Sequence, residues 1–408
     1  MKSRLVSMLL ATLSVWLGAA SFVSAADPVI APVLQPFVDG RTLAGAVTLV
    51  ADSEKVLDVE TVGYADIAAK KPMAPDTVVW IASMTKPITA TALMLLVDEG
   101  KVNLDDPVEK YLPEFRGQMV IAEKTDAQLV LKKPTRPVSV RDVLRHTGGL
   151  VSNSPIEPKL DAVPLREATL VYGLSPIKFD PGAKYEYNNP GINTAGRIIE
   201  VVSGRPYDVF LQQRLLDPLG MTDTSFILSD DQAERLAKSY KPNAEKKDLE
   251  ETTVTYLTYP LTDPRRFAFP GGGLFSTAED LSKFCRMILN GGVHEGKRLL
   301  SEQAVREMTS TQTGDLLNEG KSESGYGLGW QTHKKSSGES GPAVAGKCGH
   351  GGAYSTNMTI DPEHGLVLIY LVQHAGYAND DGGKILPAFQ QAAVNAFSKS
   401  QPKAAESK

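Results

Sequence analysis

The chain has few of the residues that disulfide or metal chemistry requires. Among its 408 residues are only two cysteines, Cys285 and Cys348, and six histidines that show no close spacing. Two cysteines do not form a disulfide scaffold, and scattered histidines do not form a metal-ligand motif. We therefore expect no metal site and no cofactor. Two alternatives stay open for the cysteines: a pair formed in an oxidising compartment, or two buried free thiols.

Long apolar runs are absent beyond the first 25 residues. Lys2 and Arg4 precede a mostly apolar, charge-free run over 5–22, and residues 23–25 (VSA) offer small side chains for cleavage. This order is typical of a secretory signal peptide over 1–25, with a mature chain that starts near Ala26 and is periplasmic or secreted. An uncleaved anchor is the alternative, but the run is short and interrupted, so we expect no stable membrane anchor.

An excess of positive charge is also absent. The formal net charge is −5, and removal of Lys2 and Arg4 makes it −7 (−5 − 2). A mildly acidic chain disfavours nonspecific binding to nucleic acid, so we expect no nucleic-acid partner. The composition, 42% hydrophobic and 22% charged, is that of an ordinary globular protein.

Strand-like patterns occur near both ends of the chain, and helical patterns lie between them. This order disfavours a doubly wound parallel sheet and favours an α+β fold, with an antiparallel sheet built from both ends and an inserted helical region. A flexible loop is expected over 334–346 and a disordered tail over 399–408. The predicted strands are 46–51, 56–62, 354–360 and 366–372, with another opening at 325–330, and the predicted helices are 83–99, 138–145, 193–203, 207–216, 277–289 and 387–397.

A Ser-x-x-Lys motif at the start of the first long helical pattern is the main candidate for chemistry. Ser83 and Lys86 would face the same way on a helix, so the amine can accept the hydroxyl proton if burial lowers its pKa. Pro87 is tolerated only in a first helical turn, which places Ser83 at or just before the helix start with a free N–H. The same motif recurs at Ser175 and Ser400, so it is weak alone, and a plain helix N-cap is the alternative.

Two further motifs offer supporting groups. Tyr187 and Asn189 follow a turn signal, and a lysine cation nearby would lower the pKa of the phenol and let it move protons. His350 precedes Gly351 and Gly352, which would let a substrate backbone approach, and the N–H of Ala353 can serve an oxyanion. The alternatives are an ordinary loop tyrosine and a strand entry with a solvated histidine.

Three other features are interpreted as structural. His146 ends a helical pattern, where a cation is favoured by the helix dipole. The glycine-rich run 270–274 lacks the Gly-Lys-Ser/Thr of a phosphate loop and is expected to pack tightly near the site. Tyr377 and Asn379 repeat the Tyr-x-Asn spacing after the final strand, and we expect no catalytic role for them.

The motifs SMTK (83–86), YNN (187–189) and HGG (350–352), in that order, resemble those of serine β-lactamases, DD-peptidases and related esterases. The resemblance covers about 40–398 and implies the β-lactamase/transpeptidase-like fold. It implies a catalytic domain over 26–398, with a sheet subdomain (about 26–80 and 266–398) and a helical subdomain (about 81–265). The stretches 80–115, 138–150, 218–221 and 271–281 resemble the class C branch.

The family roles that the resemblance implies follow by position. Ser83 is acylated, Lys86 accepts its proton, Tyr187 acts as general base or acid, and Asn189 orients the substrate and the lysine. The N–H groups of Ser83 and Ala353 form the oxyanion hole. The resemblance also implies that the substrate contacts are made by Asn189, His350, Gly351, Gly352 and Ala353.

His350 stands where many β-lactamases have the lysine of Lys-Thr-Gly. This histidine, the sequence SMTKP (83–87) and the segment 118–137 together resemble family VIII carboxylesterases. A small-molecule acyl substrate is implied: an ester first, with a β-lactam or a D-Ala-D-Ala peptide as the alternative. A penicillin-recognising binding module without turnover is a second alternative, which an intact Ser83, Lys86 and Tyr187 set disfavours. Gly-x-Ser-x-Gly is absent, which disfavours an α/β-hydrolase.

Overall fold

The computed structural model describes residues 27–151, 159–317, 324–333 and 346–398. The predicted signal peptide, the predicted tail and nearly all of the predicted loop over 334–346 lie outside these residues. Within the described part of the chain, no helix combines the length and the apolar character needed to cross a membrane. The predicted limits of the two subdomains stay a prediction.

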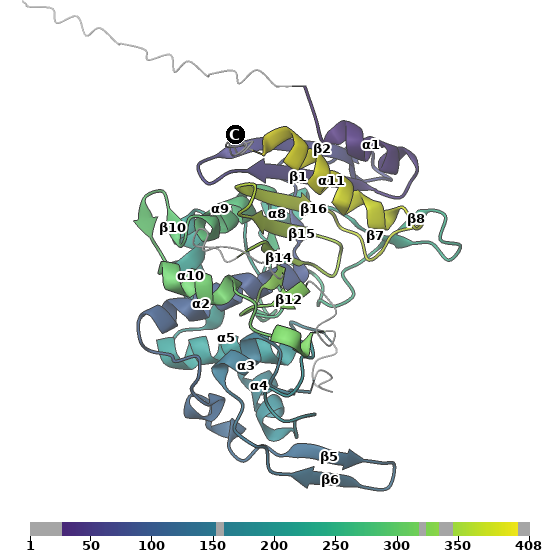
Figure 1. Cartoon of the computed structure of the whole chain (residues 1–408). Helices are drawn as coiled ribbons and strands as arrows, with labels where there is room; N and C mark the ends of the chain where they lie inside the picture. Colours follow the sequence, from purple (N-terminus) through teal and green to yellow (C-terminus); the bar gives the residue numbers. More distant parts are fainter. Residues whose placement is uncertain (1–26, 152–158, 318–323, 334–345, 399–408) are drawn as a thin grey trace, which may run out of the picture.

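One eight-stranded sheet, with every neighbouring pair antiparallel, forms the upper layer of the molecule in Figure 1. The strand order places the first strand of the chain beside the last one, so both ends of the sequence build the centre of the sheet. In sheet order the strands are β12 (Ser324–Tyr326), β13 (Gln331–His333), β14 (Cys348–Gly351), β15 (Asn357–Asp361), β16 (Leu366–Leu371), β1 (Gly45–Ala51), β2 (Val56–Asp66) and β3 (Lys71–Pro72).

Both faces of the central strands are buried. Along β16, Leu366, Leu368 and Tyr370 enter one apolar cluster, and the alternate residues enter another, as the two-residue period of a strand requires. Helices α1 (Ala31–Asp39) and α11 (Gly382–Phe397) cover the first face, as Figure 1 shows. Helix α9 (Ala278–Leu289) packs on the opposite face.

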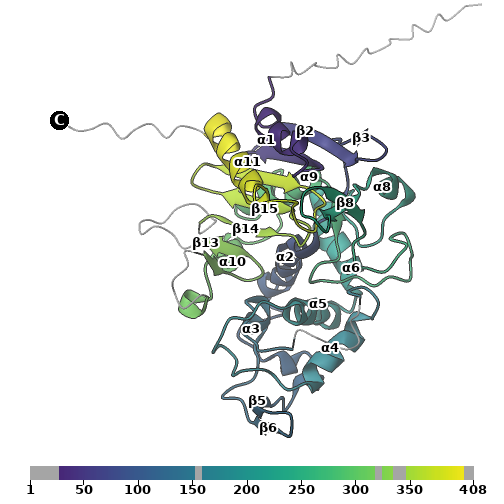
Figure 2. The ribbon, with the colours of Figure 1, turned by 90° about the vertical axis from the view of Figure 1, so that its right-hand side faces the viewer.

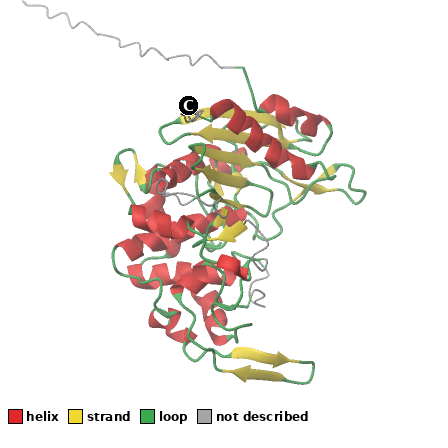
Figure 3. Ribbon diagram, in the orientation of Figure 1, coloured by secondary structure: helices red, strands yellow, loops and turns green. Residues whose placement is uncertain are grey.

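Most of the remaining helices fill the lower part of the molecule, which Figure 2 shows from the side and Figure 3 by element type, whereas α8 lies at the level of the sheet. Helix α2 (Thr85–Asp98) lies at the centre of this region and is buried along nearly its whole length. The others are α3 (Val140–Leu144), α4 (Leu165–Leu174), α5 (Asn189–Ser203), α6 (Tyr207–Leu211), α7 (Asp217–Leu219), α8 (Asp230–Arg235) and α10 (Glu302–Thr309), with short turns η1 (Ala82–Met84), η2 (Val108–Lys110), η3 (Pro113–Phe115), η4 (Gln212–Leu216) and η5 (Gly314–Leu316).

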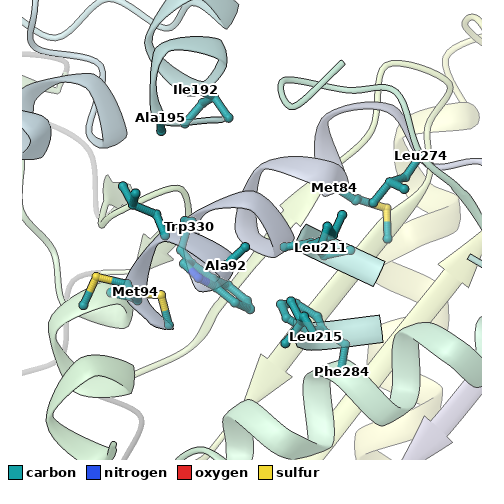
Figure 4. Close-up of a cluster of buried hydrophobic side chains, with 14 of the residues drawn as sticks. Met84, Ala92, Met94, Ile192, Ala195, Leu211, Leu215, Leu274, Phe284 and Trp330 are labelled. Carbon is teal, nitrogen blue, oxygen red and sulfur yellow. The ribbon is translucent and has the colours of Figure 1, made fainter. Parts of the chain in front are cut away.

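Apolar packing around α2 joins the sheet to the helical region. Figure 4 shows Met84, Ala92 and Met94 among side chains from several other elements. Phe284 of α9 stacks on Trp330, with ring centroids 5.8 Å apart. Because α2 carries the Ser-x-x-Lys motif at its start, this packing fixes the position of the motif.

Short two-stranded sheets lie outside the main sheet. The β5–β6 pair projects from the end of the helical region that is farthest from the main sheet in Figures 1 and 2, and β6 is exposed along its length. The short sheets pair β4 (Val79–Trp80) with β9 (Phe275–Ser276), β5 (Val120–Lys124) with β6 (Leu129–Lys132), β7 (Ser239–Pro242) with β8 (Leu249–Thr252), and β10 (Val293–His294) with β11 (Lys297–Arg298).

The structure confirms the predicted α+β class and corrects several predicted bounds. The strand expected over 354–360 begins at Asn357, because 352–356 form a tight turn in which the Gly352 N–H donates to the Thr356 carbonyl. The strand expected over 325–330 ends at Tyr326, because a turn with Gly329 in the left-handed region follows. The helix expected over 387–397 begins five residues earlier, at Gly382.

Candidate active site

Ser83 lies in the short turn η1, directly before α2, as Pro87 predicts. The first N–H groups of a helix have no intrahelical acceptor, so the Ser83 N–H is available to an incoming oxygen. The preceding residue, Ala82, has a φ of +47°, a left-handed conformation that is strained for alanine. The turn therefore presents Ser83 in a fixed and unusual backbone geometry.

Lys86 is fully buried and contacts three oxygen atoms. Its Nζ lies 3.0 Å from the Ser83 Oγ, 2.8 Å from the Asn189 Oδ1 and 2.5 Å from the Gly271 carbonyl oxygen. Burial lowers the pKa of this amine to about 7. The two oxygens other than Ser83 Oγ only accept hydrogen bonds, so a neutral amine that donates to both turns its lone pair toward Ser83.

Tyr187 lies in the segment before α5 and reaches the same two residues. Its phenol shares a hydrogen bond with Ser83, and its ring centroid is 4.8 Å from the Lys86 Nζ. Desolvation by the surrounding protein raises the pKa of the phenol above its ordinary value and outweighs the hydrogen bond with Ser83, although Tyr187 keeps 40% of its surface exposed. The expectation that a lysine cation lowers this pKa is therefore wrong, because burial is the larger effect.

The sequence had suggested that Asn189 lies in a loop. The structure shows that it is the first residue of α5. Asn188 caps the helix, and its side chain accepts a hydrogen bond from the Gly191 N–H. The cap directs the Asn189 amide to Lys86. Gly271, in the glycine-rich run expected to pack near the site, contacts Lys86 through its carbonyl, and a Cβ there would lie 3.1 Å from the Asn189 Oδ1.

His350 lies on β14 and is buried, which contradicts the solvated alternative. Its Nδ1 is 2.7 Å from the Gly351 carbonyl oxygen, so this nitrogen donates and carries the proton. The Nε2 then accepts from the Tyr326 hydroxyl, 3.1 Å away. Burial, and then the charge of Lys86, lower the pKa of His350 to about 3, so the imidazole is neutral and both nitrogens are occupied.

The turn after His350 packs against the segment that carries the nucleophile. A Cβ on Gly352 would lie 2.7 Å from the Ile81 carbonyl oxygen and 2.0 Å from the Thr356 Oγ1. Gly352 is thus needed for packing, whereas the sequence had suggested that it admits a substrate backbone. Gly351 has no atom within 3.7 Å of its built Cβ. Ala353 follows in the same turn.

His146 was interpreted as a structural residue at a helix end, where the dipole favours a cation, but the structure places it inside the site. It is fully buried, and its ring centroid lies 4.6 Å from that of Tyr187 and 4.7 Å from that of Tyr326. Burial, followed by the charge of Lys86, lowers its pKa well below the ordinary value. The sequence predicts only that the run with Gly271 packs near the site, and it indicates no role for Tyr326.

The repeated motifs lie elsewhere. Ser175 ends α4, where its hydroxyl donates to the Val171 carbonyl, and Lys178 pairs with Glu186. Tyr377 stacks on His374, with ring centroids 5.2 Å apart. Ser400 lies outside the described residues. Both cysteines, Cys285 and Cys348, are buried free thiols.

Comparisons with known proteins agree with this arrangement. The family model described as Beta-lactamase matches residues 30–392. An uncharacterised protein from Mycobacterium tuberculosis is 34% identical over 357 residues, which are 82% of this chain and 87% of that protein.

Two further comparisons add an enzyme and a fold. Esterase EstB from Burkholderia gladioli is 28% identical over 391 residues, which cover 88% of this chain and 92% of EstB. The solved structure of simvastatin synthase LovD from Aspergillus terreus superposes with a TM-score of 0.74 at 22% identity, covering 92% of this chain and all (100%) of LovD. The second likeness shows the β-lactamase/transpeptidase-like fold.

The family model matches most of the chain, and the relatives include esterases and D-alanyl-D-alanine carboxypeptidases. Both findings agree with the fold and with the order of the three motifs. The chain belongs to the beta-lactamase family of serine hydrolases.

Proposed function

We propose that the protein hydrolyses carboxylic esters through an acyl-enzyme formed on Ser83. The observation that carries this choice is the neutral His350, whose two nitrogens are occupied by Gly351 and Tyr326. A β-lactam or a D-Ala-D-Ala peptide brings a carboxylate, which a lysine at this position would attract. A buried neutral imidazole offers no such attraction, so a neutral ester fits better.

The first step uses the buried amine of Lys86. With its N–H groups directed to Asn189 and Gly271, the neutral amine accepts the Ser83 proton through its lone pair. The Ser83 Oγ then attacks the ester carbonyl carbon. A pKa of about 7 leaves much of Lys86 neutral near neutral pH, so the base is ready without a further proton transfer.

The second step stabilises charge and releases the alcohol. The N–H groups of Ser83 and Ala353 face the developing oxyanion. Tyr187, protonated because its pKa is raised, donates its proton to the leaving alkoxide oxygen as the acyl–oxygen bond breaks. Water then attacks the acyl-enzyme and gives a proton to the Tyr187 phenolate, Lys86 returns its proton to the Ser83 oxygen as the acyl–oxygen bond breaks, and the acid and free Ser83 are released.

The close alternative is a β-lactamase or D-Ala-D-Ala peptidase that uses the same groups. Purified protein is offered p-nitrophenyl butyrate, nitrocefin and a D-Ala-D-Ala peptide, and the acyl adduct is detected by intact mass. Ester turnover far above the other two supports the proposal, and the reverse order rejects it. Stoichiometric labelling without turnover would instead support a binding module.

Two variants serve as controls. Ser83→Ala is expected to abolish turnover and the adduct. Ser175→Ala removes the serine of a second Ser-x-x-Lys motif, whose hydroxyl only caps α4, and is expected to change neither. Full activity in Ser83→Ala would reject the mechanism.

We also propose that the chain is exported and cleaved after Ala25, on the basis of Lys2, Arg4 and the apolar run over 5–22. Expression of the full chain in a bacterial host, followed by N-terminal sequencing, tests this. The expected product is in the periplasm or medium and begins at Ala26. A product in the cytoplasm with its first 25 residues intact would contradict export.

A further inference from the structure

We propose that His146 is a positioning residue that holds Tyr187 against Ser83 and Lys86. The inference rests on the proposed function, because it assumes that Tyr187 acts in catalysis. It concerns a residue of the turn after α3, which lies far from the three motifs in sequence and contacts the second motif directly in space.

His146 binds the backbone on both sides of Tyr187. Its carbonyl accepts the N–H of Glu186 at 2.9 Å, and its Nδ1 accepts the N–H of Asn188 at 3.4 Å. The imidazole also packs on the Tyr187 ring, at 4.6 Å between centroids and an interplanar angle of 50°. One residue thus fixes the chain before Tyr187, the chain after it and one face of its ring.

The backbone of His146 is itself held firmly. Its φ of +60° lies in the left-handed region, which a histidine adopts only where neighbouring contacts impose it. The next residue, Thr147, donates its N–H to the Asp142 carbonyl and its hydroxyl to the Asp142 carboxylate at 2.8 Å. That carboxylate is fully buried and also paired with Arg136 and Arg145. A rigid turn therefore presents His146 to Tyr187.

The hydrogen bonds assign the tautomer. Because Nδ1 accepts from Asn188, the proton of the neutral ring sits on Nε2. This Nε2 is buried and has no hydrogen-bond partner among the described residues, and the Tyr187 and Tyr326 rings pack beside the imidazole. Since His374 also leaves one ring nitrogen without a hydrogen-bond partner in the described part of the chain, the role of His146 is inferred from its contacts with the Tyr187 segment rather than from this nitrogen.

Burial, and then the charge of Lys86, oppose protonation of His146. Protonation would add a proton to Nδ1 and break the bond from Asn188. The neutral form, which keeps that bond, is thus the form that holds Tyr187 in place.

Two substitutions separate the contacts. His146→Leu keeps much of the volume and removes the acceptor. His146→Asn tolerates the left-handed backbone and offers an amide oxygen near the position of Nδ1. We expect kcat on p-nitrophenyl butyrate to fall by roughly 10- to 100-fold in His146→Leu, with KM little changed, because a small misplacement of a catalytic group costs about that much. His146→Asn is expected to recover part of the loss.

Tyr187→Phe supplies the decisive comparison. If His146 acts through Tyr187, then His146→Leu lowers kcat much less in the Tyr187→Phe background than in the wild type. An equal loss in both backgrounds would overturn the proposal.

His374→Leu is the matched control for lost folding stability. His374 is also buried, accepts a backbone N–H (from Ala44, at 3.0 Å) and stacks on a tyrosine, Tyr377. We expect it to lower the melting temperature with a much smaller effect on kcat than His146→Leu, all assays being run well below each melting temperature. Equal losses of kcat in the two variants would reject a positioning role.

A second readout does not depend on ester turnover. The rate at which a fluorophosphonate labels Ser83, followed by intact mass, is expected to fall in both Tyr187→Phe and His146→Leu. If Ser83→Ala kept ester turnover, the proposed function would fail, and the labelling rates would still decide the role of His146. Labelling of His146→Leu at the wild-type rate, with slow labelling of Tyr187→Phe, would overturn the inference.

Discussion

Lys86 is fully buried among three oxygen atoms, and this burial sets the acidity of its amine. Because burial lowers its pKa to about 7, the amine is neutral above that pH and protonated below it. We expect kcat/KM for an ester to rise with pH through about 7 and to fall about tenfold per unit on the acid side. A pH–rate profile between pH 4 and 9 measures this.

The variant His350→Gln tests whether an imidazole causes the rise of kcat/KM near pH 7. The pKa of His350 is about 3 and that of His146 is lowered well below its ordinary value, so neither ring titrates near neutral pH. The rise near pH 7 should persist in His350→Gln, whatever the absolute rate. Its disappearance would assign the titration to the histidine.

Gly351 and Gly352 are adjacent, but only the second has no room for a Cβ atom. Ala at 352 would drive its methyl group into the Ile81 carbonyl and the Thr356 hydroxyl, whereas Ala at 351 meets nothing closer than 3.7 Å. We expect Gly352→Ala to cost about 1–3 kcal/mol of unfolding free energy and Gly351→Ala much less. Chemical denaturation of both variants measures the difference, and equal costs would contradict the packing argument.

The sequence could predict some site residues and not others. Ser83 and Lys86 are three positions apart on one helix start, so local geometry alone brings them together. His146 and Gly271 reach the site only through tertiary packing, which no local pattern encodes. His146 looked like a helix-end cation because the sequence did not show that three tyrosine rings, those of Tyr185, Tyr187 and Tyr326, surround it.

At the scale of elements, α1 is tied to the sheet through one carboxylate. Glu60 of β2 accepts the N–H groups of Val29 and Ile30 at 2.8 and 3.0 Å and that of Ala31 at 2.6 Å. Burial would raise the pKa of Glu60, but these three donors outweigh it and lower the pKa. The Glu60 carboxylate therefore contributes to folding stability above its ordinary pKa of 4.5, and this contribution is lost as the pH falls below that value.

Glu60→Gln is expected to cost roughly 2 kcal/mol at neutral pH, because charge-assisted hydrogen bonds are lost at the start of α1. Limited proteolysis should then cut first near α1. Glu54→Gln is the control, since Glu54 is exposed on the same hairpin. Equal stability of Glu60→Gln and the wild type at neutral pH would show that the carboxylate does not anchor α1.

Elements with a clear apolar period were predictable from the sequence, and elements without one were not. The strands β1 and β16 are apolar along their length, and α9 has a strong apolar face, so their patterns predict them. The β5–β6 pair was missed because β6 is exposed on both faces and shows no alternation. Helix α10 has few apolar residues, and only its buried side meets the core.

For the whole molecule, α11 and α1 together cover one apolar face of the main sheet. Ile385, Phe389 and Ala393 are fully buried against the sheet. A chain truncated after residue 381 would expose that apolar face, and we expect it to aggregate or to be degraded. A chain truncated after residue 398 is the control and should keep its melting temperature and activity. A soluble, active chain ending at 381 would contradict this assignment.

The pairing of β1 with β16 also governs the order of events when the protein is made. Val47 pairs with Leu371, roughly 320 residues later, so the centre of the sheet cannot close until almost all of the chain has left the ribosome. A nascent chain of this topology stays open during synthesis. Such a delay would suit the export proposed above, because a polypeptide that is still open when synthesis ends can be threaded across a membrane before its sheet closes.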